Sequence, residues 1–456
     1  MPNLPSLMSP TSSMFLIPES REQPMHVGGL QLFVPPDGAG PDAIATLYRE
    51  MVQTNDVARV FRRRPYRSLA TLGQWAWLDD ADIDLEHHVR HSALPRPGRV
   101  RELLALASRL HSTLLDRKRP LWETHLIEGL EDGRFAVYTK VHHALMDGVA
   151  AMKLLERSLS TDPDERDMPM PFGELPARPR PSKEPGGSAL LQGLRTGANV
   201  VTDAVTLTPK LLDLAVHTLR SLPGEAPKSM LNVDITGSRR FAADAWDIGR
   251  IKAVGKKADA TLNDVVLAMC SAALRDYLLA EDALPDAPLV AMTPVSLRTS
   301  EEADGGNAVG AILCSLATDL GDPEARLLAV RDSMRAGKAT LAGLSQLQIT
   351  ALSALVTAPL LVNSSLGAHR YIRPAFNLII SNVPGPPGPM YWNGARLDGH
   401  FPMSIPLSGQ ALNITVTSYD GRLNFGLTGC RRSLPHMQRL LHGLDEGLAQ
   451  LEKAFA

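Results

Sequence analysis

The motif His-His-x-x-x-Asp-Gly at residues 142–148 most constrains the fold of this chain, because it separates a strand pattern from a helical pattern. Residues 135–141 are rich in aromatic and β-branched side chains, which favour a strand. Residues 149–159 carry apolar side chains at helical spacing, which predicts a helix. The motif is therefore predicted to lie in a tight turn between a strand and a helix.

Of the two adjacent histidines, His143 is the candidate general base. Side chains alternate along a strand, so His143 is predicted to share a face with Val141, whereas His142 shares the opposite face with Lys140. An imidazole with an ordinary pKa of about 6.5 can take a proton from an alcohol and return it to a leaving thiolate. The motif thus indicates acyl transfer without a covalent enzyme intermediate, with a buried structural histidine as the alternative for His143. We include His142 among the catalytic candidates, although its position is more typical of a structural neighbour.

Asp147 is predicted to begin the helix that follows the motif. A carboxylate in the first turn of a helix most often caps the backbone or pairs with a cation, and a direct chemical role is the alternative. Gly148 follows at the same turn and is a candidate substrate-binding residue.

Several short motifs occur along the chain in the order seen in one family of bacterial enzymes. They are Pro-Leu-Trp at 120–122, the histidine motif at 142–148, Asn-Asp at 263–264, Pro-Val-Ser-Leu-Arg at 294–298 and Ile-Ser-Asn-Val-Pro-Gly-Pro at 380–386. On these motifs the chain resembles the bacterial wax ester synthase/diacylglycerol acyltransferase family over nearly its whole length. A looser resemblance to chloramphenicol acetyltransferases and peptide-synthetase condensation domains depends mainly on the histidine motif. The Asp-Phe-Gly-Trp-Gly signature of some of those relatives is absent from the sequence.

The family resemblance implies an α/β fold of two chloramphenicol acetyltransferase-like sandwich domains, joined by a crossover, with the active site at their interface. It implies a diacylglycerol O-acyltransferase that moves a long-chain acyl group from acyl-CoA to diacylglycerol, with His143 as the general base. Acyl-CoA would then be a substrate, and no cofactor is expected. Two alternatives stay open: a wax ester synthase that uses a long-chain fatty alcohol, and a non-catalytic lipid-binding or droplet protein.

The resemblance also implies substrate-binding residues in the C-terminal half. Asn263 and Asp264 match the family's Asn-Asp motif and would line the site, with a helix N-cap as the alternative for either residue. Arg298 would hold the motif aspartate Asp147 in an ion pair, with a surface cation as the alternative.

Ser381 and Asn382 follow an apolar strand and are the remaining substrate-binding candidates. Their hydroxyl and amide groups can donate to an oxyanion or contact CoA, and a strand-terminating turn is the alternative. Trp122, in contrast, brings no acid or base, so we expect it to be a buried anchor.

The chain is long enough for two domains. Its 456 residues exceed the size at which a single core keeps growing, and 44% hydrophobic with 21% charged residues is typical of a globular protein. A proline-rich stretch at 161–187 favours an extended crossover. We therefore predict an N-terminal acyltransferase domain at 1–165, a crossover with apolar helices at 166–235 and a C-terminal acyltransferase-like domain at 236–456.

Composition restricts the partners of the chain. With 47 basic and 49 acidic residues, the net charge gives no reason to expect nucleic acid. The three cysteines are far apart, and the histidines at 87, 88 and 91 lack a full ligand set, so no disulfide and no metal are expected. We see no leader and no apolar run long enough to span a bilayer, which predicts a cytoplasmic protein. The apolar stretches at 188–222 and 341–372 are predicted either to pack in the core or to touch a membrane or lipid-droplet surface.

Hydrophobic periodicity predicts the remaining elements. Helices are predicted at 42–53, 101–115, 263–281 and 437–451, and strands at 124–127, 135–141, 289–292, 311–317, 377–381 and 412–419.

Overall fold

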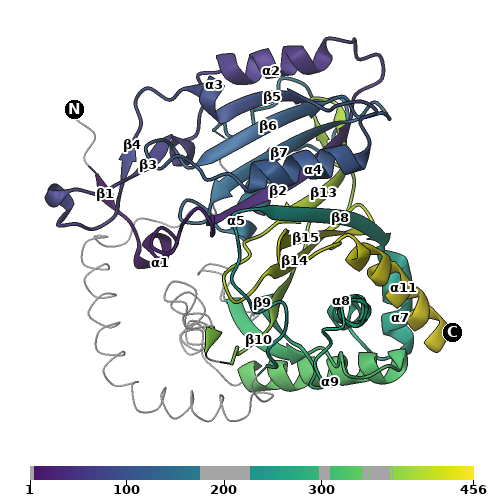
Figure 1. Cartoon of the computed structure of the whole chain (residues 1–456). Coiled ribbons are helices and arrows are strands. Elements are labelled where there is room, and N and C mark those ends of the chain that lie inside the picture. The colour runs from purple at the N-terminus through teal and green to yellow at the C-terminus, as the bar shows by residue number, and fades with distance from the viewer. Residues whose placement is uncertain (1–4, 175–225, 297–308, 343–348, 350–369, 372) are drawn as a thin grey trace, which may run out of the picture.

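Two six-stranded sheets form the centre of the protein, in a computed structural model that describes residues 5–174, 226–296, 309–342, 349, 370–371 and 373–456 (Figure 1). The N-terminal sheet has the strand order β12-β13-β2-β7-β6-β5, and the C-terminal sheet has the order β10-β9-β11-β14-β15-β8. A small sheet, in the order β1-β4-β3, extends from the N-terminal half (Figure 1).

The N-terminal sheet is covered on both faces. Apolar residues of α4 pack on one face, and those of α2 and α5 pack on the other. Its strands are β2 (His26–Val34), β5 (Val89–Ala93), β6 (Trp122–Glu128), β7 (Phe135–His142), β12 (Tyr391–Trp392) and β13 (Ala395–Met403), and its helices are α2 (Ala43–Gln53), α3 (Leu85–His88), α4 (Val100–His111) and α5 (Gly148–Arg157).

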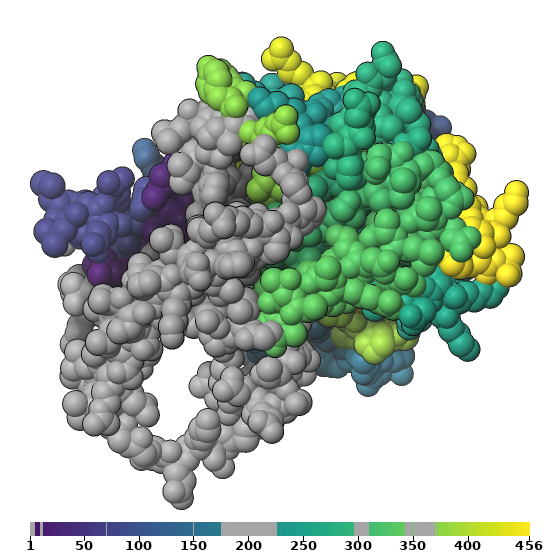
Figure 2. Space-filling model, turned by 90° about the horizontal axis from the view of Figure 1, so that it is seen from below, coloured from purple at the N-terminus to yellow at the C-terminus, as the bar shows by residue number. Residues whose placement is uncertain are grey.

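The C-terminal sheet is mixed, because β11 runs parallel to both β9 and β14 whereas its other pairs are antiparallel. Its strands are β8 (Arg239–Asp247), β9 (Val290–Ser296), β10 (Val309–Ser315), β11 (Leu378–Val383), β14 (Leu412–Tyr419) and β15 (Arg422–Cys430). Its helices are α7 (Ile248–Lys257), α8 (Leu262–Ala280), α9 (Pro323–Ala342) and α11 (Arg439–Ala454). Helix α8 is buried on most sides because α7, α9 and α11 surround it. Seen from below, α9 forms the outer surface of this half (Figure 2).

The small sheet consists of β1 (Ser6–Leu7), β3 (Arg63–Tyr66) and β4 (Ala76–Asp79), with α1 (Pro10–Ser13) and the 3-10 helices η1 (Arg59–Arg62) and η2 (Leu69–Thr71) beside it. None of the helices in the described ranges is both long enough and apolar enough to cross a membrane.

Strand β13 comes from the C-terminal half of the chain but is part of the N-terminal sheet. It pairs antiparallel with β2, so that His400 lies opposite Gln31. The domain boundaries predicted at 165 and 235 stay a prediction. Two boundaries along the sequence cannot assign β13 to the sheet in which it lies. Residues 391–403 lie within the predicted C-terminal domain and are hydrogen-bonded to the N-terminal sheet.

The predicted elements are present within a few residues of their expected ends. The predicted helix at 263–281 is α8, and the predicted strand at 412–419 is β14. The sequence patterns missed β2, β8, β13 and β15. In β2, two adjacent glycines interrupt the apolar pattern, since Gly28 and Gly29 have no side chains to contribute to it. The apolar stretch at 188–222 and most of the stretch at 341–372 lie outside the described residues.

Close contact between the two sheets generates a stability prediction. A side chain at Gly426 on β15 would overlap the carbonyl oxygen of Pro402 on β13. Because backbone cannot move aside cheaply, we expect Gly426→Ala to lower the free energy of unfolding by about 2 kcal/mol or more in urea denaturation. The control is Gly40→Ala, where the added methyl meets nothing within 4 Å. Equal stability of the two variants would contradict this close approach of the sheets.

Candidate active site

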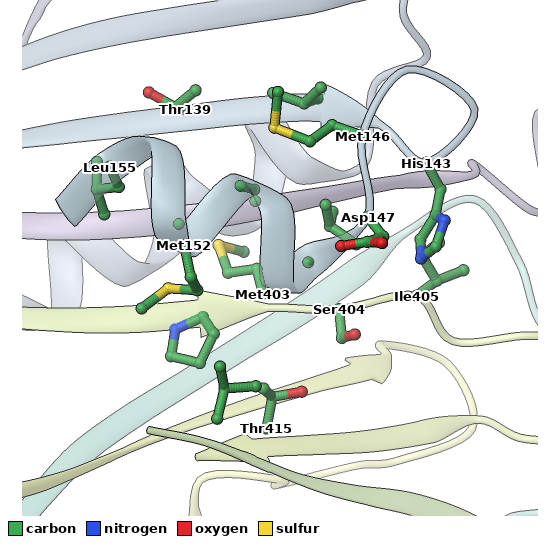
Figure 3. Close-up of a pocket in the computed structure, with 18 of the residues that line it drawn as sticks. Thr139, His143, Met146, Asp147, Met152, Leu155, Met403, Ser404, Ile405 and Thr415 are labelled. Carbon is green, nitrogen blue, oxygen red and sulfur yellow. The ribbon is translucent and has the colours of Figure 1, made fainter. Parts of the chain in front are cut away.

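A cavity of about 630 Å³ lies where the two sheets and helix α5 meet (Figure 3). Strands β2, β6, β7 and β13 form one wall, β9, β11 and β14 form another, and α5 closes the space between them. Apolar side chains, with methionine the most frequent, make most of the lining, and His143, Asp147 and Gly148 lie at one part of it. A cavity with a mainly apolar lining and a few polar groups fits a hydrocarbon chain that carries a reactive polar end.

His143 lines this cavity directly after β7. Its backbone N–H donates to the carbonyl of Met25 at 2.8 Å, and its ring stacks on Phe15 with ring centres 4.0 Å apart. Val141 lines the same cavity, which confirms the predicted alternation along the strand. Nδ1 of His143 is buried and has no hydrogen-bond partner among the described residues.

Burial determines the charge of His143. It lowers the pKa of the imidazole to about 4, although the nearby Asp147 carboxylate acts in the opposite direction. The ring is therefore neutral at physiological pH and can accept a proton.

Asp147 has a structural and an electrostatic effect. Its Oδ1 accepts the backbone N–H of Ala150 at 2.7 Å, so it caps α5 as predicted. It also lines the cavity beside His143 (Figure 3). Its predicted ion-pair partner, Arg298, lies outside the described residues. Gly148 is the first residue of α5 and lines the cavity next to it.

His142 lies on the opposite face of β7 and is fully buried. Its Nδ1 accepts the backbone N–H of Ala144 at 3.0 Å, so its proton is on Nε2, which lies 3.1 Å from Oε1 of Glu19. It is not among the residues that line the cavity. His142 is thus hydrogen-bonded within the loop, on the face of β7 away from the cavity.

Glu19 organises this part of the chain and was not found from the sequence. Its side chain is 3% exposed, and Arg117 donates to it at 2.8 Å. It also accepts the backbone N–H of Met25 at 3.2 Å, in addition to the bond from His142. Burial alone would raise the pKa of Glu19, but His142 and Arg117 outweigh it and hold the pKa below its usual value. No local pattern marks Glu19, because the residues it binds lie up to 123 positions away along the chain.

Of the substrate-binding residues predicted in the C-terminal half, some line the cavity and others do not. Ser381 on β11 lines the cavity, and Thr415, its register partner on β14, lines it too. Asn382, the next residue on the strand, is not among the lining residues. The strand alternation separates the two side chains that the sequence motif had placed together.

Asn263 and Asp264 do not line the cavity and belong to the start of α8. The N-cap of this helix is Thr261, which corrects the alternative that either of them would be the cap. Asp264 closes the capping box, because its Oδ2 accepts the backbone N–H of Thr261 at 2.8 Å. A carboxylate three residues after the cap is typical of this motif.

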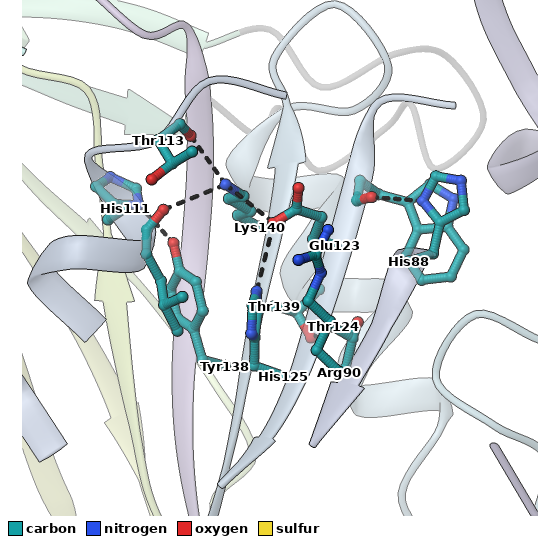
Figure 4. Close-up of polar contacts among 12 residues, drawn as sticks. His88, Arg90, His111, Thr113, Glu123, Thr124, His125, Tyr138, Thr139 and Lys140 are labelled. Carbon is teal, nitrogen blue, oxygen red and sulfur yellow. Dashed lines mark hydrogen bonds and ion pairs between the residues drawn. The ribbon is translucent and has the colours of Figure 1, made fainter. Parts of the chain in front are cut away.

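A buried polar network packs against the face of β7 that points away from the cavity (Figure 4). The ammonium group of Lys140 lies 3.1 Å from Glu123 and donates to the backbone carbonyls of Leu110 and Thr113 at 3.2 and 2.8 Å. It thereby binds the C-terminal end of α4, where unpaired carbonyls favour a cation. Because these contacts fix Lys140, they also fix the strand register that brings His143 to the cavity.

His88, one of the histidines before β6, makes structural contacts. Its Nδ1–H donates to the carbonyl of Trp122 at 2.8 Å, and its ring stacks on the Trp122 indole. Trp122 is fully buried, as expected, and its Nε1 donates to the carbonyl of Phe61 at 2.8 Å. Within the described ranges, no group of three or more histidine, cysteine, aspartate or glutamate residues is arranged to hold a metal ion.

The chain matches two family models. Residues 8–266 match the wax ester synthase/diacylglycerol acyltransferase catalytic domain, and residues 305–452 match the C-terminal domain of the same family. A probable diacylglycerol O-acyltransferase of Mycobacterium tuberculosis, tgs2, is 52% identical over 453 residues, which cover 98% of this chain and 99% of that protein. A putative diacylglycerol O-acyltransferase of Mycobacterium bovis matches with the same identity and coverage.

Solved structures agree with the predicted fold. The wax ester synthase/diacylglycerol acyltransferase from Marinobacter aquaeolei VT8 is 43% identical, with a TM-score of 0.79 over 99% of this chain and 100% of that one. The first condensation domain of the calcium-dependent antibiotic synthetase aligns over 99% of this chain and 96% of that one, with a TM-score of 0.60. Its identity of 16% shows a shared fold alone. The predicted two-part α/β architecture is confirmed.

Buried histidines generate a prediction about acid stability. Burial lowers the pKa of His143 and His400 to about 4 and that of His111 to about 3, below the value of about 6.5 in an unfolded chain. The unfolded state therefore binds more protons below pH 6.5, and stability falls as the pH decreases toward 4. By pH 5.5, each of these sites should lower the free energy of unfolding by about 1.4 kcal/mol relative to pH 7.5.

The measurement is urea unfolding at pH 7.5 and 5.5. His400→Phe removes one such site, and the described residues give the His400 ring no hydrogen bond that would be lost. Between pH 7.5 and pH 5.5, we expect the free energy of unfolding of this variant to decrease by about 1.4 kcal/mol less than that of the wild type. The same decrease in the free energy of unfolding in the variant and the wild type would show that His400 does not contribute to the pH dependence.

Proposed function

The chain belongs to the wax ester synthase/diacylglycerol acyltransferase family, and we propose that it transfers a long-chain acyl group from acyl-CoA to diacylglycerol, forming triacylglycerol. The observation that carries this proposal is His143, neutral and partly buried, in the wall of a mainly apolar cavity between the two sheets. Diacylglycerol is favoured over a fatty alcohol because relatives 52% identical over nearly the whole chain are named diacylglycerol O-acyltransferases.

The reaction is a single displacement. The free hydroxyl oxygen of diacylglycerol attacks the thioester carbonyl while His143 takes the hydroxyl proton. The tetrahedral intermediate then collapses, the carbon–sulfur bond breaks, and the imidazolium returns the proton to the CoA thiolate. Because Nδ1 is enclosed, we assign the proton transfers to Nε2.

Two features of the cavity assist the charge changes in this reaction. Asp147 lies beside His143, and its carboxylate favours the imidazolium that forms during attack. Ser381 lines the opposite wall, where its hydroxyl can donate to the oxyanion of the intermediate. The apolar lining excludes water, which would otherwise hydrolyse the thioester.

The substrates also set where the enzyme works. Diacylglycerol and triacylglycerol partition into lipid, so we propose that the protein meets its acceptor at the surface of a membrane or a lipid inclusion. Acyl-CoA, with its charged nucleotide, would reach the cavity from the aqueous side.

Replacing His143 tests the proposed base. With radiolabelled palmitoyl-CoA and dioleoylglycerol, we expect His143→Ala to lower the rate of triacylglycerol formation by at least about 100-fold, because general-base assistance is lost. Thin-layer chromatography separates the products, and hexadecanol serves as the competing acceptor. Wax ester as the sole product of the wild type would contradict the assigned acceptor, and full activity of His143→Ala would contradict the base.

Replacing Glu19 tests the positioning of that base. Glu19→Ala leaves His142, Arg117 and the Met25 amide without their shared acceptor, so we expect kcat to fall about tenfold or more, with a smaller change in KM. Glu19→Gln keeps one oxygen acceptor and should recover part of kcat. Folding is followed by thermal unfolding, because a variant that loses kcat only in proportion to its folded fraction would contradict a positioning role.

A further inference from the structure

The hairpin between β3 and β4 ends in two leucines that point into solvent. Leu69 is 93% exposed and Leu72 is 90% exposed, so two large apolar side chains lie together in solvent at the tip of one turn. A further exposed leucine, Leu7 on β1, lies beside the same hairpin, because β1 pairs with β4. The hairpin extends from the left of the molecule, away from the two large sheets (Figure 1).

The turn that carries the two leucines is closed by its own hydrogen bonds. The backbone N–H of Leu72 donates to the carbonyl of Leu69 at 2.9 Å, and that of Gly73 donates to Ser68 at 3.0 Å. Thr71 Oγ1 accepts the N–H of Ser68, and Arg67 donates to the carbonyl of Gly73. Polar backbone groups that are paired internally can enter an apolar phase at low cost.

Leu72 adopts a left-handed backbone conformation, with φ of 50°. This conformation is unfavourable for a leucine, and a glycine or asparagine would adopt it more easily. A large apolar side chain that points into solvent at this position contributes nothing to the core of the protein. The chain therefore keeps a strained, exposed leucine at the tip.

Positive charge flanks the tip of the hairpin. Arg67 is exposed beside it, where its guanidinium group donates to the carbonyl of Gly73 and lies 5.6 Å from the centre of the Trp75 ring. The acidic Asp79 lies at the other end of the hairpin, where it pairs with Arg59 and Arg63. An apolar tip with a cationic flank is complementary to a lipid surface that carries negative head groups.

The hairpin is also in contact with the catalytic loop. Trp77 on β4 packs in one apolar cluster with Ala144 of the histidine motif, and Trp75 and Phe15 pack against that cluster. Phe15 in turn stacks on His143 and lines the cavity. A lipid surface that meets the hairpin is therefore next to the wall of the cavity that holds the base.

We propose that the β3–β4 hairpin docks the protein on an anionic phospholipid surface, with Leu69 and Leu72 among the acyl chains and Arg67 against the head-group phosphates. This rests on the proposed function, because a lipid surface is where the diacylglycerol acceptor resides. Docking through the hairpin places the cavity beside the phase from which the acceptor is taken.

Vesicle flotation tests the docking directly. The probe is full-length protein with vesicles of phosphatidylcholine alone or with phosphatidylglycerol added. We expect wild-type protein to float with the anionic vesicles and Leu69→Ser/Leu72→Ser to bind them at least tenfold more weakly. The matched control is Leu279→Ser at the end of α8, a 51% exposed leucine remote from the hairpin in sequence, which should bind as the wild type does. Arg67→Gln should reduce the preference for anionic over neutral vesicles.

Activity separates this proposal from the assigned reaction. The double variant should lose at least tenfold activity on dioleoylglycerol presented in vesicles and keep its activity on dissolved dihexanoylglycerol. Wild-type protein that transfers acyl groups to neither acceptor would contradict the proposed function. Vesicle binding by the double variant equal to that of the wild type would overturn the docking hairpin.

Discussion

The buried carboxylate of Glu19 determines where the reacting histidine lies. It accepts hydrogen bonds from His142, from Arg117 and from the amide of Met25, and the carbonyl of Met25 in turn accepts the amide of His143. A carboxylate is costly to bury without such partners, and each partner is itself placed by the others. The orientation of the histidine motif thus depends on one N-terminal residue rather than on the motif alone.

The cavity depends on a different constraint. Strand β13, from the C-terminal half of the chain, is part of the N-terminal sheet. Strand β13 leaves the C-terminal half, pairs with β2 at the N-terminal sheet and then returns to β14. This route holds the two sheets in close contact where Gly426 meets the Pro402 carbonyl, and leaves the cavity between them. A binding site at an interface between two sheets needs that spacing to be fixed, because a base misplaced by one ångström loses much of its effect.

Much of the fold followed from local sequence patterns, and much of the site did not. The strand-to-helix turn, the cap at Asp147 and the opposite faces of His142 and His143 all depend on neighbours within one element, so alternation and helical spacing predicted them. Strand β2 was missed because Gly28 and Gly29 remove the apolar signal. Glu19 was missed because its partners come from distant parts of the chain, and no single-sequence pattern reports such contacts. Asn263 and Asp264 were expected to line the site from a family motif, and the structure places them in a helix cap that sits away from the cavity.

The low pKa of His143 has opposite effects on the two halves of the proposed reaction. Burial holds the pKa at about 4, so the neutral ring is a weaker base toward the acceptor hydroxyl than an exposed imidazole would be. The same burial makes the imidazolium a stronger acid toward the departing thiolate, which must gain a proton or leave as an anion in an apolar cavity. Asp147 offsets part of both effects by the same amount, because its carboxylate stabilises the imidazolium that forms in the first step and donates in the second. A base shielded from water and placed beside one carboxylate therefore suits a transfer in which the same proton passes from an alcohol to a thiolate.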